Sequence, residues 1–168
     1  MIVAMARSAC TPSNLHLDVC PSVRDVRVMD VLTDAAVAGG AAAVLSGAPS
    51  TSHALLTGAD PLEASLAAGT LLLSGEKRAS RLLPAALAAH GALSFGWALV
   101  LVGCLPARRT LAWSVLAGLA IAALDLGVVG RRYPRIRALP LAPQVLDHVA
   151  YAATVGWVLS RRRARRAS

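Results

Sequence analysis

The sequence predicts an all-α integral membrane protein, a four-helix transmembrane bundle with a short interfacial helix between its first and second spans. Hydrophobic residues make up 56% of the 168 residues, the mean hydropathy is +0.59, and 15% of the residues are charged, against about 25% in soluble domains. The charges gather in blocks between apolar runs, as expected when lipid excludes them. The strongest runs have about the ~20 residues that a helix needs to cross a bilayer.

Residues 1–28 precede the first apolar run, and we expect them to be a disordered tail or the product of a misassigned start. They lack the ~7–15-residue apolar centre of a signal peptide. Within them Cys10, His16 and Cys20 could contribute to a metal site. Their spacing matches no standard zinc pattern and a fourth ligand is missing, so a tail without a metal is the favoured interpretation.

The membrane domain is expected to cover residues 29–160, and its first span to cover residues 31–48. This span is alanine-rich and carries Asp34 near its start. Small residues recur at every fourth position, which either suits close helix packing in lipid or follows from the alanine content alone. These residues are Ala35, Gly39, Ala43 and Gly47.

The connection to the second span contains signals for two short helices. The first could end at Gly58. For the second, Asp60 fits an N-cap, Pro61 fits the first helical position and Glu63 can close a capping box. That helix is predicted to run to Leu73, and it is too short to cross a bilayer at ~1.5 Å per residue. We therefore predict an interfacial or re-entrant helix, with a fifth, thin span as the alternative.

The other three spans are predicted at residues 82–105, 110–130 and 139–160, followed by a basic tail at 161–168. The second and third spans each carry a ridge of small residues that suits helix packing. The ridges consist of Ala88, Ala92 and Gly96 in the second span, and of Ser114, Gly118 and Ala122 in the third.

Ionisable residues inside these spans are the candidates for function, because charges in hydrocarbon are costly. At the helical rise, Asp125 lies roughly 7 Å from Gly130, Asp147 and His148 roughly 6–8 Å from Pro143, and His90 roughly 12 Å from Leu82. All four are expected in one leaflet. In the fourth span, polar residues three and four positions apart form a stripe along one face of the helix. This face should point into the bundle. The candidate intramembrane cluster is His90, Asp125, Gln144, Asp147, His148 and Tyr151.

Three interpretations of this cluster are open. In the leading one, the polar groups lock the helices together by hydrogen bonds in a structural or accessory membrane protein without enzymatic activity. In the second, they form a proton or solute path in a small oligomeric transporter or channel. In the third, His and Asp hold a metal ion in a membrane-embedded enzyme. The sequence shows no soluble-enzyme motif such as a phosphate loop or a nucleophile elbow, so we assign no catalytic residue and predict no cofactor.

The net charge is +8, from 17 Lys and Arg against 9 Asp and Glu. Such an excess would suggest nucleic acid in a soluble domain, but short basic segments beside apolar spans more often meet anionic lipid headgroups. We therefore predict the bilayer as the main partner, with a second copy or another membrane protein possible and no nucleic acid. The predicted headgroup contacts are Arg131, Arg132, Arg135, Arg137, Arg161, Arg162 and Arg163. Of the four arginines in the turn between the third and fourth spans, at most one is expected to neutralise Asp125 or Asp147 instead of contacting lipid.

Two segments, DPLEASLAAGTLLL and LDLGVVGRRYPRIRALPLAPQVLDHVAYA, resemble stretches of small uncharacterised multi-pass membrane proteins of high-GC bacteria. The resemblance covers roughly residues 29–160 and implies only the membrane class and the expectation for residues 1–28. We expect the protein in a bacterial cytoplasmic membrane, as a multi-pass protein. No activity comes with this group, so no functional residue is carried over. The basic residues divide evenly between the two membrane sides, but the block at 161–166 directly abuts a span. It predicts that both termini are cytoplasmic.

Overall fold

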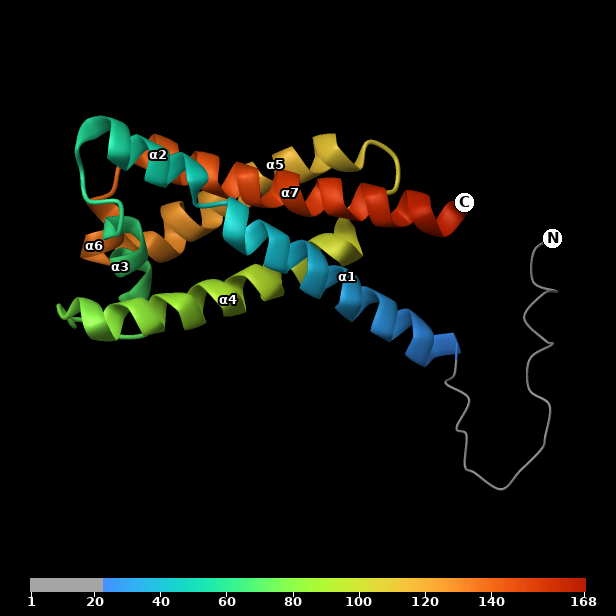
Figure 1. Ribbon diagram of the computed structural model, residues 1–168, viewed down its shortest axis with the longest axis horizontal. Helices are drawn as coiled ribbons and strands as arrows, with labels where there is room; N and C mark the ends of the chain where they lie inside the picture. Colours follow the sequence, from blue (N-terminus) through green and yellow to red (C-terminus); the bar gives the residue numbers. More distant parts are fainter. Residues whose placement is uncertain (1–22) are drawn as a thin grey trace, which may run out of the picture.

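The structure, a computed structural model, describes residues 23–168, and this range contains helices and no β-strand (Figure 1). The all-α prediction is therefore confirmed for this range. The elements are α1 (Val23–Leu45), α2 (Ala48–Thr57), α3 (Glu63–Gly69), α4 (Ala79–Cys104), α5 (Thr110–Leu124), a π-helical turn η1 (Asp125–Val129), a 3₁₀ turn η2 (Gly130–Arg132), α6 (Pro134–Arg137) and α7 (Leu141–Ala167).

Within residues 23–168, three helical stretches are long and apolar enough to cross a membrane. They are Arg27–Thr57, Ala79–Cys104 and Thr110–Arg132, and they contain most of the first three predicted spans. Only 28%, 28% and 22% of their most apolar windows are buried inside the bundle, and large side chains such as Leu56 and Leu87 are exposed. Apolar surface of this extent is typical of helices that face lipid.

The predicted fourth span, residues 139–160, falls on α7, which is not among these three stretches. With 27 residues, α7 is long enough to cross a bilayer. Its apolar character is lowered by Gln144, Asp147 and His148, the polar stripe of the sequence. The predicted basic tail at 161–168 is helical as far as Ala167, where α7 ends.

The first predicted span is longer than its sequence pattern indicated. α1 already begins at Val23, so residues 23–28 of the predicted tail are helical. Residues 1–22, with the candidate ligands Cys10, His16 and Cys20, lie outside the described residues. The helix breaks between Leu45 and Ala48 because Pro49 has no N–H to donate to the Leu45 carbonyl.

The two short helices after this break confirm part of the predicted connection. α2 ends at Gly58 in the left-handed conformation (φ 70°), which glycine adopts without strain. The Asp60 carboxylate accepts a hydrogen bond from the Leu62 N–H (2.8 Å). The predicted capping box is wrong, because the Glu63 carboxylate binds Arg135. The prediction of a helix as far as Leu73 is also wrong, since α3 ends at Gly69.

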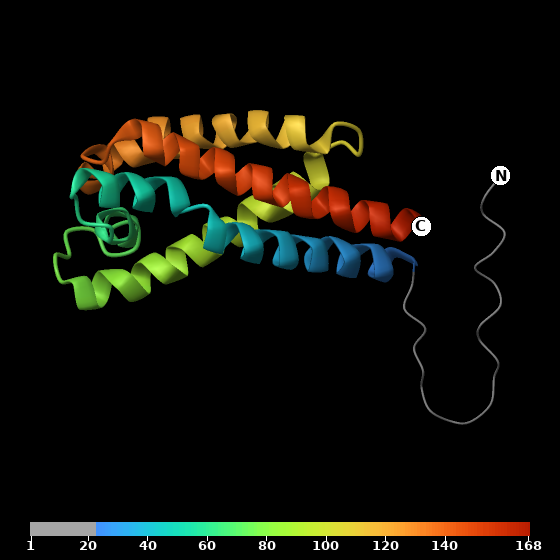
Figure 2. The same ribbon diagram turned by 45° about the horizontal axis from the view of Figure 1, so that its top comes forward.

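The helix α7 lies at the centre of the packing. α5 packs along it, and α1 and α2 contact it from the other side. α4 packs mainly against α1 and α3 (Figures 1 and 2). Gly118 allows α5 to approach α7 closely. A Cβ at this position would lie 2.8 Å from the His148 carbonyl oxygen and 2.9 Å from the Val149 Cα.

The predicted ridges of small residues differ in burial between α5 and α4. Ser114, Gly118 and Ala122 are buried in α5, as predicted. On α4, in contrast, Ala88, Ala92 and Gly96 are exposed, and this helix packs through another face. That face contains Leu82, Ala86, Ala89, Ala98 and Leu101. The predicted ridge of the second span is therefore wrong as an intramolecular contact.

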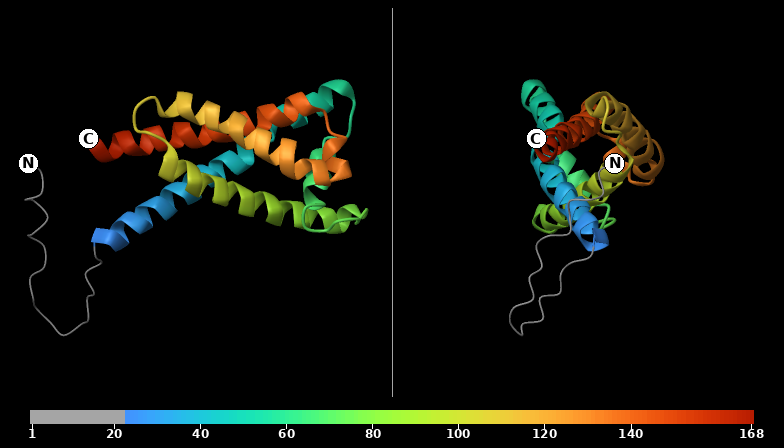
Figure 3. Two further views of the ribbon diagram at one scale, coloured as in Figure 1. Left: turned by 180° about the vertical axis from the view of Figure 1, so that it is seen from behind. Right: turned by 90° about the vertical axis from the view of Figure 1, so that its right-hand side faces the viewer.

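The bundle has two ends, and different segments of the chain form each of them (Figure 3). The tail end, as we name it, consists of the start of α1, the turn at residues 106–109 and the end of α7. The turn end consists of the α2–α3 connection, the start of α4, η2, α6 and the start of α7.

Candidate functional site

A polar contact joins three of the long helices inside the bundle. The Asp125 carboxylate, at the start of η1, lies 3.4 Å from Nε2 of His148 on α7. The same carboxylate accepts a hydrogen bond from the indole Nε1–H of Trp97 on α4 (3.2 Å). Because η1 continues α5, this contact links α4, α5 and α7. The π-helical turn at Asp125 is a local departure from the α-helix of a kind that often occurs at functional sites.

The two ring nitrogens of His148 face different partners. Its Nδ1 lies 2.7 Å from the Gln144 carbonyl oxygen, which can only accept a hydrogen bond. The other ring nitrogen, Nε2, lies 3.4 Å from the Asp125 carboxylate. His148 thus connects the backbone of α7 to the carboxylate at the start of η1.

Two other members of the predicted cluster bind the backbone on either side of the α1–α2 break. His90 Nε2, on α4, donates to the carbonyl oxygen of Ala43 in the last turn of α1 (2.9 Å). The Asp147 carboxylate, on α7, accepts from the N–H of Ser50 in the first turn of α2 (2.9 Å). Helix ends leave such groups without intrahelical partners, and their partial charges favour a donor at the C-terminus and a carboxylate at the N-terminus.

The remaining two members of the cluster do not join it directly. The buried Tyr151 hydroxyl donates to the carbonyl oxygen of Ser94 on α4. Gln144 lines a separate depression of about 210 Å³ at the turn end, together with Arg137 and aliphatic side chains. The six predicted residues thus lie at several contacts between helices and do not converge on one point.

Sequence reasoning missed the partners that complete these contacts. The indole of Trp97 comes from a different helix, and Ser50 contributes a backbone N–H that no side-chain pattern reveals. The intrahelical spacing of the polar stripe gave the correct face of α7. It could not give the residues on the facing helices.

A second ionic group ties the tail end together. The buried Asp34 carboxylate of α1 binds Arg162 Nε (2.5 Å) and Arg166 Nη1 (2.9 Å) of α7. Arg166 also reaches Asp30 at 3.3 Å. Arg163 donates to the carbonyl oxygens of Leu105 (3.1 Å) and Pro106 (3.3 Å), beyond the end of α4.

These contacts change the interpretation of the predicted headgroup arginines at this end. Arg162 and Arg163 have protein partners, and the Arg161 guanidinium lies over the Trp157 ring at 5.5 Å from its centroid. Such a cation–π contact is itself attractive. The arginine block at the tail end therefore fastens α7 to α1 and α4.

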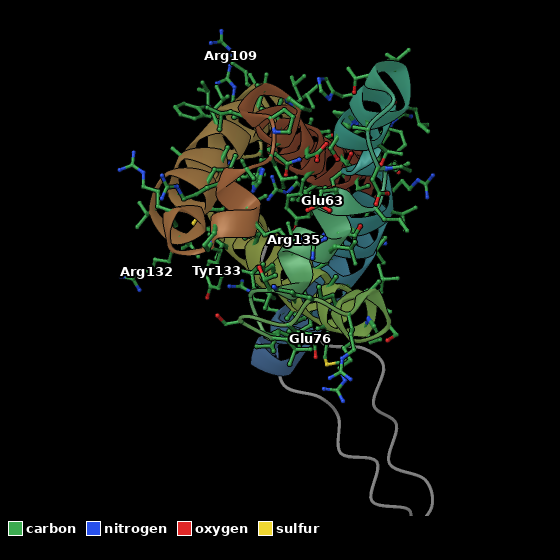
Figure 4. All side chains as sticks on the ribbon, turned by 90° about the vertical axis from the view of Figure 1, so that its left-hand side faces the viewer. Glu63, Glu76, Arg109, Arg132, Tyr133 and Arg135 are labelled. Atoms are coloured by element: carbon green, nitrogen blue, oxygen red, sulfur yellow. The ribbon has the colours of Figure 1, made fainter. Side chains whose placement is uncertain are left out.

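At the turn end, Glu63 of α3 and Arg135 of α6 form a two-pronged ion pair, with N–O distances of 2.7 and 2.8 Å. Figure 4 shows the two labelled residues together between α3 and α6. The hydrogen bonds from Arg135 lower the pKa of Glu63, and those to Glu63 raise the pKa of Arg135. None of the turn arginines pairs with Asp125 or Asp147 within residues 23–168.

Glu76 contrasts with Glu63 because its partners are local. Hydrogen bonds from the Arg78 N–H, the Arg78 guanidinium and the Lys77 N–H lower the pKa of Glu76 to about 2. A further contact reaches Arg81 Nη1 at 3.2 Å. All these groups belong to the connection before α4 and its first turn, so Glu76 orders this turn without joining distant elements.

Among the described residues, no group of three or more His, Cys, Asp and Glu side chains is placed to hold a metal ion. Comparison of the chain with family models, curated proteins and solved structures found no match. The site must therefore be interpreted from its own geometry.

Proposed function

We propose that this chain is a small multi-pass protein of a bacterial cytoplasmic membrane with a structural or accessory role. In this proposal α1–α2, α4, α5–η1–η2 and α7 are four spans that alternate in direction. The exposed apolar faces of the three membrane-length stretches support this arrangement. The place of α7 between α5 and α1 supports its role as the fourth span, because neighbouring helices cover part of its polar stripe.

The observation that carries the structural role is the satisfaction of the buried polar groups. Among the described residues, no buried side-chain nitrogen or oxygen lacks a hydrogen-bond partner. The buried Tyr151, the partly buried Asp147 and the exposed His90 each bind the backbone of another helix, and the partly buried Asp125 contacts two side chains. In hydrocarbon, such bonds hold helices in a defined register. The polar residues are therefore used to hold the bundle together.

A proton-flux assay on the full-length protein in liposomes tests this role. We expect no flux above that of protein-free vesicles under an imposed pH gradient. We also expect His148→Asn to lower the unfolding temperature in detergent, because the contact of the imidazole with the Asp125 carboxylate is lost. Flux that His148→Asn abolishes at unchanged stability would contradict the structural role.

A small proton-coupled transporter or channel is the second candidate, and one observation favours it. The first span is discontinuous, and His90 and Asp147 bind the two helix ends at its break. Broken helices within a membrane occur in transporters, where the free helix ends line a substrate or ion site. In this chain Asp125 and His148 lie on neighbouring helices. The same flux assay separates the two candidates.

A further inference from the structure

The segment between α5 and α7, at the turn end of the bundle, contains four arginines. One of them has a carboxylate partner and three do not. Arg135 is held by Glu63 in a two-pronged ion pair. Arg131, Arg132 and Arg137 are exposed and have no acidic partner within residues 23–168. Arg132 points away from the bundle (Figure 4). The turn therefore presents an excess of positive charge that no described protein group neutralises.

Arg137 differs from the other two because it borders a depression. This depression, of about 210 Å³, lies where η1, α6 and the first turns of α7 meet. The residues that line it include Arg137 and Gln144 as well as the aliphatic Leu126, Ile136, Leu139 and Leu141. A residue with a cationic side chain and one with an amide side chain thus border a largely aliphatic depression.

The placement of these groups follows the boundary of the proposed membrane. Leu126 belongs to the apolar stretch Thr110–Arg132, and Leu141 starts α7 and is highly exposed. Arg137 belongs to the turn between them. A ligand here would meet charge on the side of the turn and hydrocarbon on the side of the spans.

We propose that the depression binds the phosphate of an anionic phospholipid, with Arg137 and Gln144 as donors. Guanidinium groups bind phosphate oxygens through paired N–H donors. The aliphatic walls then contact the glycerol and the first methylenes, while Arg131 and Arg132 add long-range attraction to the anionic surface. The inference rests on the proposed membrane location. It limits the predicted headgroup contacts of the turn to the three arginines without a carboxylate partner.

Native mass spectrometry of the full-length protein in detergent tests this site. The probes are phosphatidylglycerol, phosphatidylcholine and inorganic phosphate. We expect one tightly retained phosphatidylglycerol, little phosphatidylcholine, and no displacement by millimolar phosphate. Arg137→Gln should weaken phosphatidylglycerol binding about fivefold, which corresponds to ~1 kcal/mol for one basic residue. Arg108→Gln, an exposed arginine at the tail end, should leave this first lipid bound.

Ile136→Trp separates the depression from simple charge attraction, because it fills the space and leaves every charge in place. We expect it to remove the retained lipid at an unchanged unfolding temperature. Equal binding by wild type, Arg137→Gln and Ile136→Trp would overturn the site, and so would displacement by inorganic phosphate. Extraction of wild-type protein from membranes by alkaline carbonate would instead contradict the proposed membrane location itself.

Discussion

The two ends of the bundle use arginine in opposite ways. At the tail end, Arg162 and Arg166 enclose a buried carboxylate, Asp34, and fasten α7 to α1. At the turn end, the pair of Glu63 and Arg135 is partly exposed, and three other arginines have no carboxylate partner among the described residues. Burial decides what each arginine contributes, because a charge in a low-dielectric site cannot be left without a partner whereas a surface pair adds little.

The largest expected effect comes from the tail end. The double substitution Arg162→Gln and Arg166→Gln leaves the Asp34 carboxylate buried without a cation, which costs about 3 kcal/mol. We expect a clear fall in the free energy of unfolding, measured in detergent micelles. The matched control is Arg161→Gln with Arg165→Gln, which removes the same charge from the same helix and no contact to Asp34. Equal losses in the two double variants would show that the buried ionic group does not fasten α7.

The next effect concerns the break between α1 and α2. Asp147→Leu removes the acceptor of the Ser50 N–H and should destabilise the protein by about 2 kcal/mol, the value for hydrogen bonds to charged groups. Asp147→Asn keeps an acceptor oxygen and should cost less than half as much. Amide hydrogen exchange in the first turn of α2 should rise for the leucine variant and change little for the asparagine variant. Unchanged exchange in both would contradict the cap.

The smallest effect comes from the surface pair at the turn end. Because Arg135 lowers the pKa of folded Glu63, the pair stabilises the fold above the unfolded pKa of about 4.3. This contribution is lost as the pH falls through the folded pKa. The Glu63 side chain is 40% exposed, so we expect only a few tenths of a kcal/mol.

A comparison of two variants isolates this contribution. Glu63→Gln should remove the part of the acid dependence of unfolding that comes from the pair, measured between pH 3 and pH 6. Glu76→Gln is a positive reference, because local hydrogen bonds lower the Glu76 pKa to about 2 and its loss should also reduce the acid dependence. If Glu63→Gln keeps the wild-type slope while Glu76→Gln lowers it, the pair of α3 and α6 adds nothing to stability.

The sequence was informative where one helix determines the outcome by itself. Apolar length located the helices that became α4, α5 and α7, and the spacing of Asp147 and Tyr151 located the inward face of α7. It was also sufficient to place the helix end at Gly58, since a left-handed glycine is a local signal.

What the sequence did not reveal depends on contacts between distant segments. Glu63 satisfies a capping-box pattern, yet its carboxylate binds Arg135, which lies 72 positions later in the sequence. In the same way, Asp34 and Arg162 are 128 positions apart, so no local pattern relates them. The sequence shows only that the arginines lie close to spans, which predicts contact with lipid headgroups. This proximity is the same at both ends of the bundle, so it does not distinguish them.

The most direct test of the four-span proposal is the membrane topology of the tail end and the turn end. A reporter active only outside the cytoplasm is fused after Ser168 or inserted at Gly75, in the connection before α4. We expect no signal from Ser168 and a strong signal from Gly75, because four spans place these sites on opposite sides and the basic block after residue 160 favours the cytoplasm. Equal signals at the two sites would contradict the four alternating spans, and the reverse pattern would contradict the orientation.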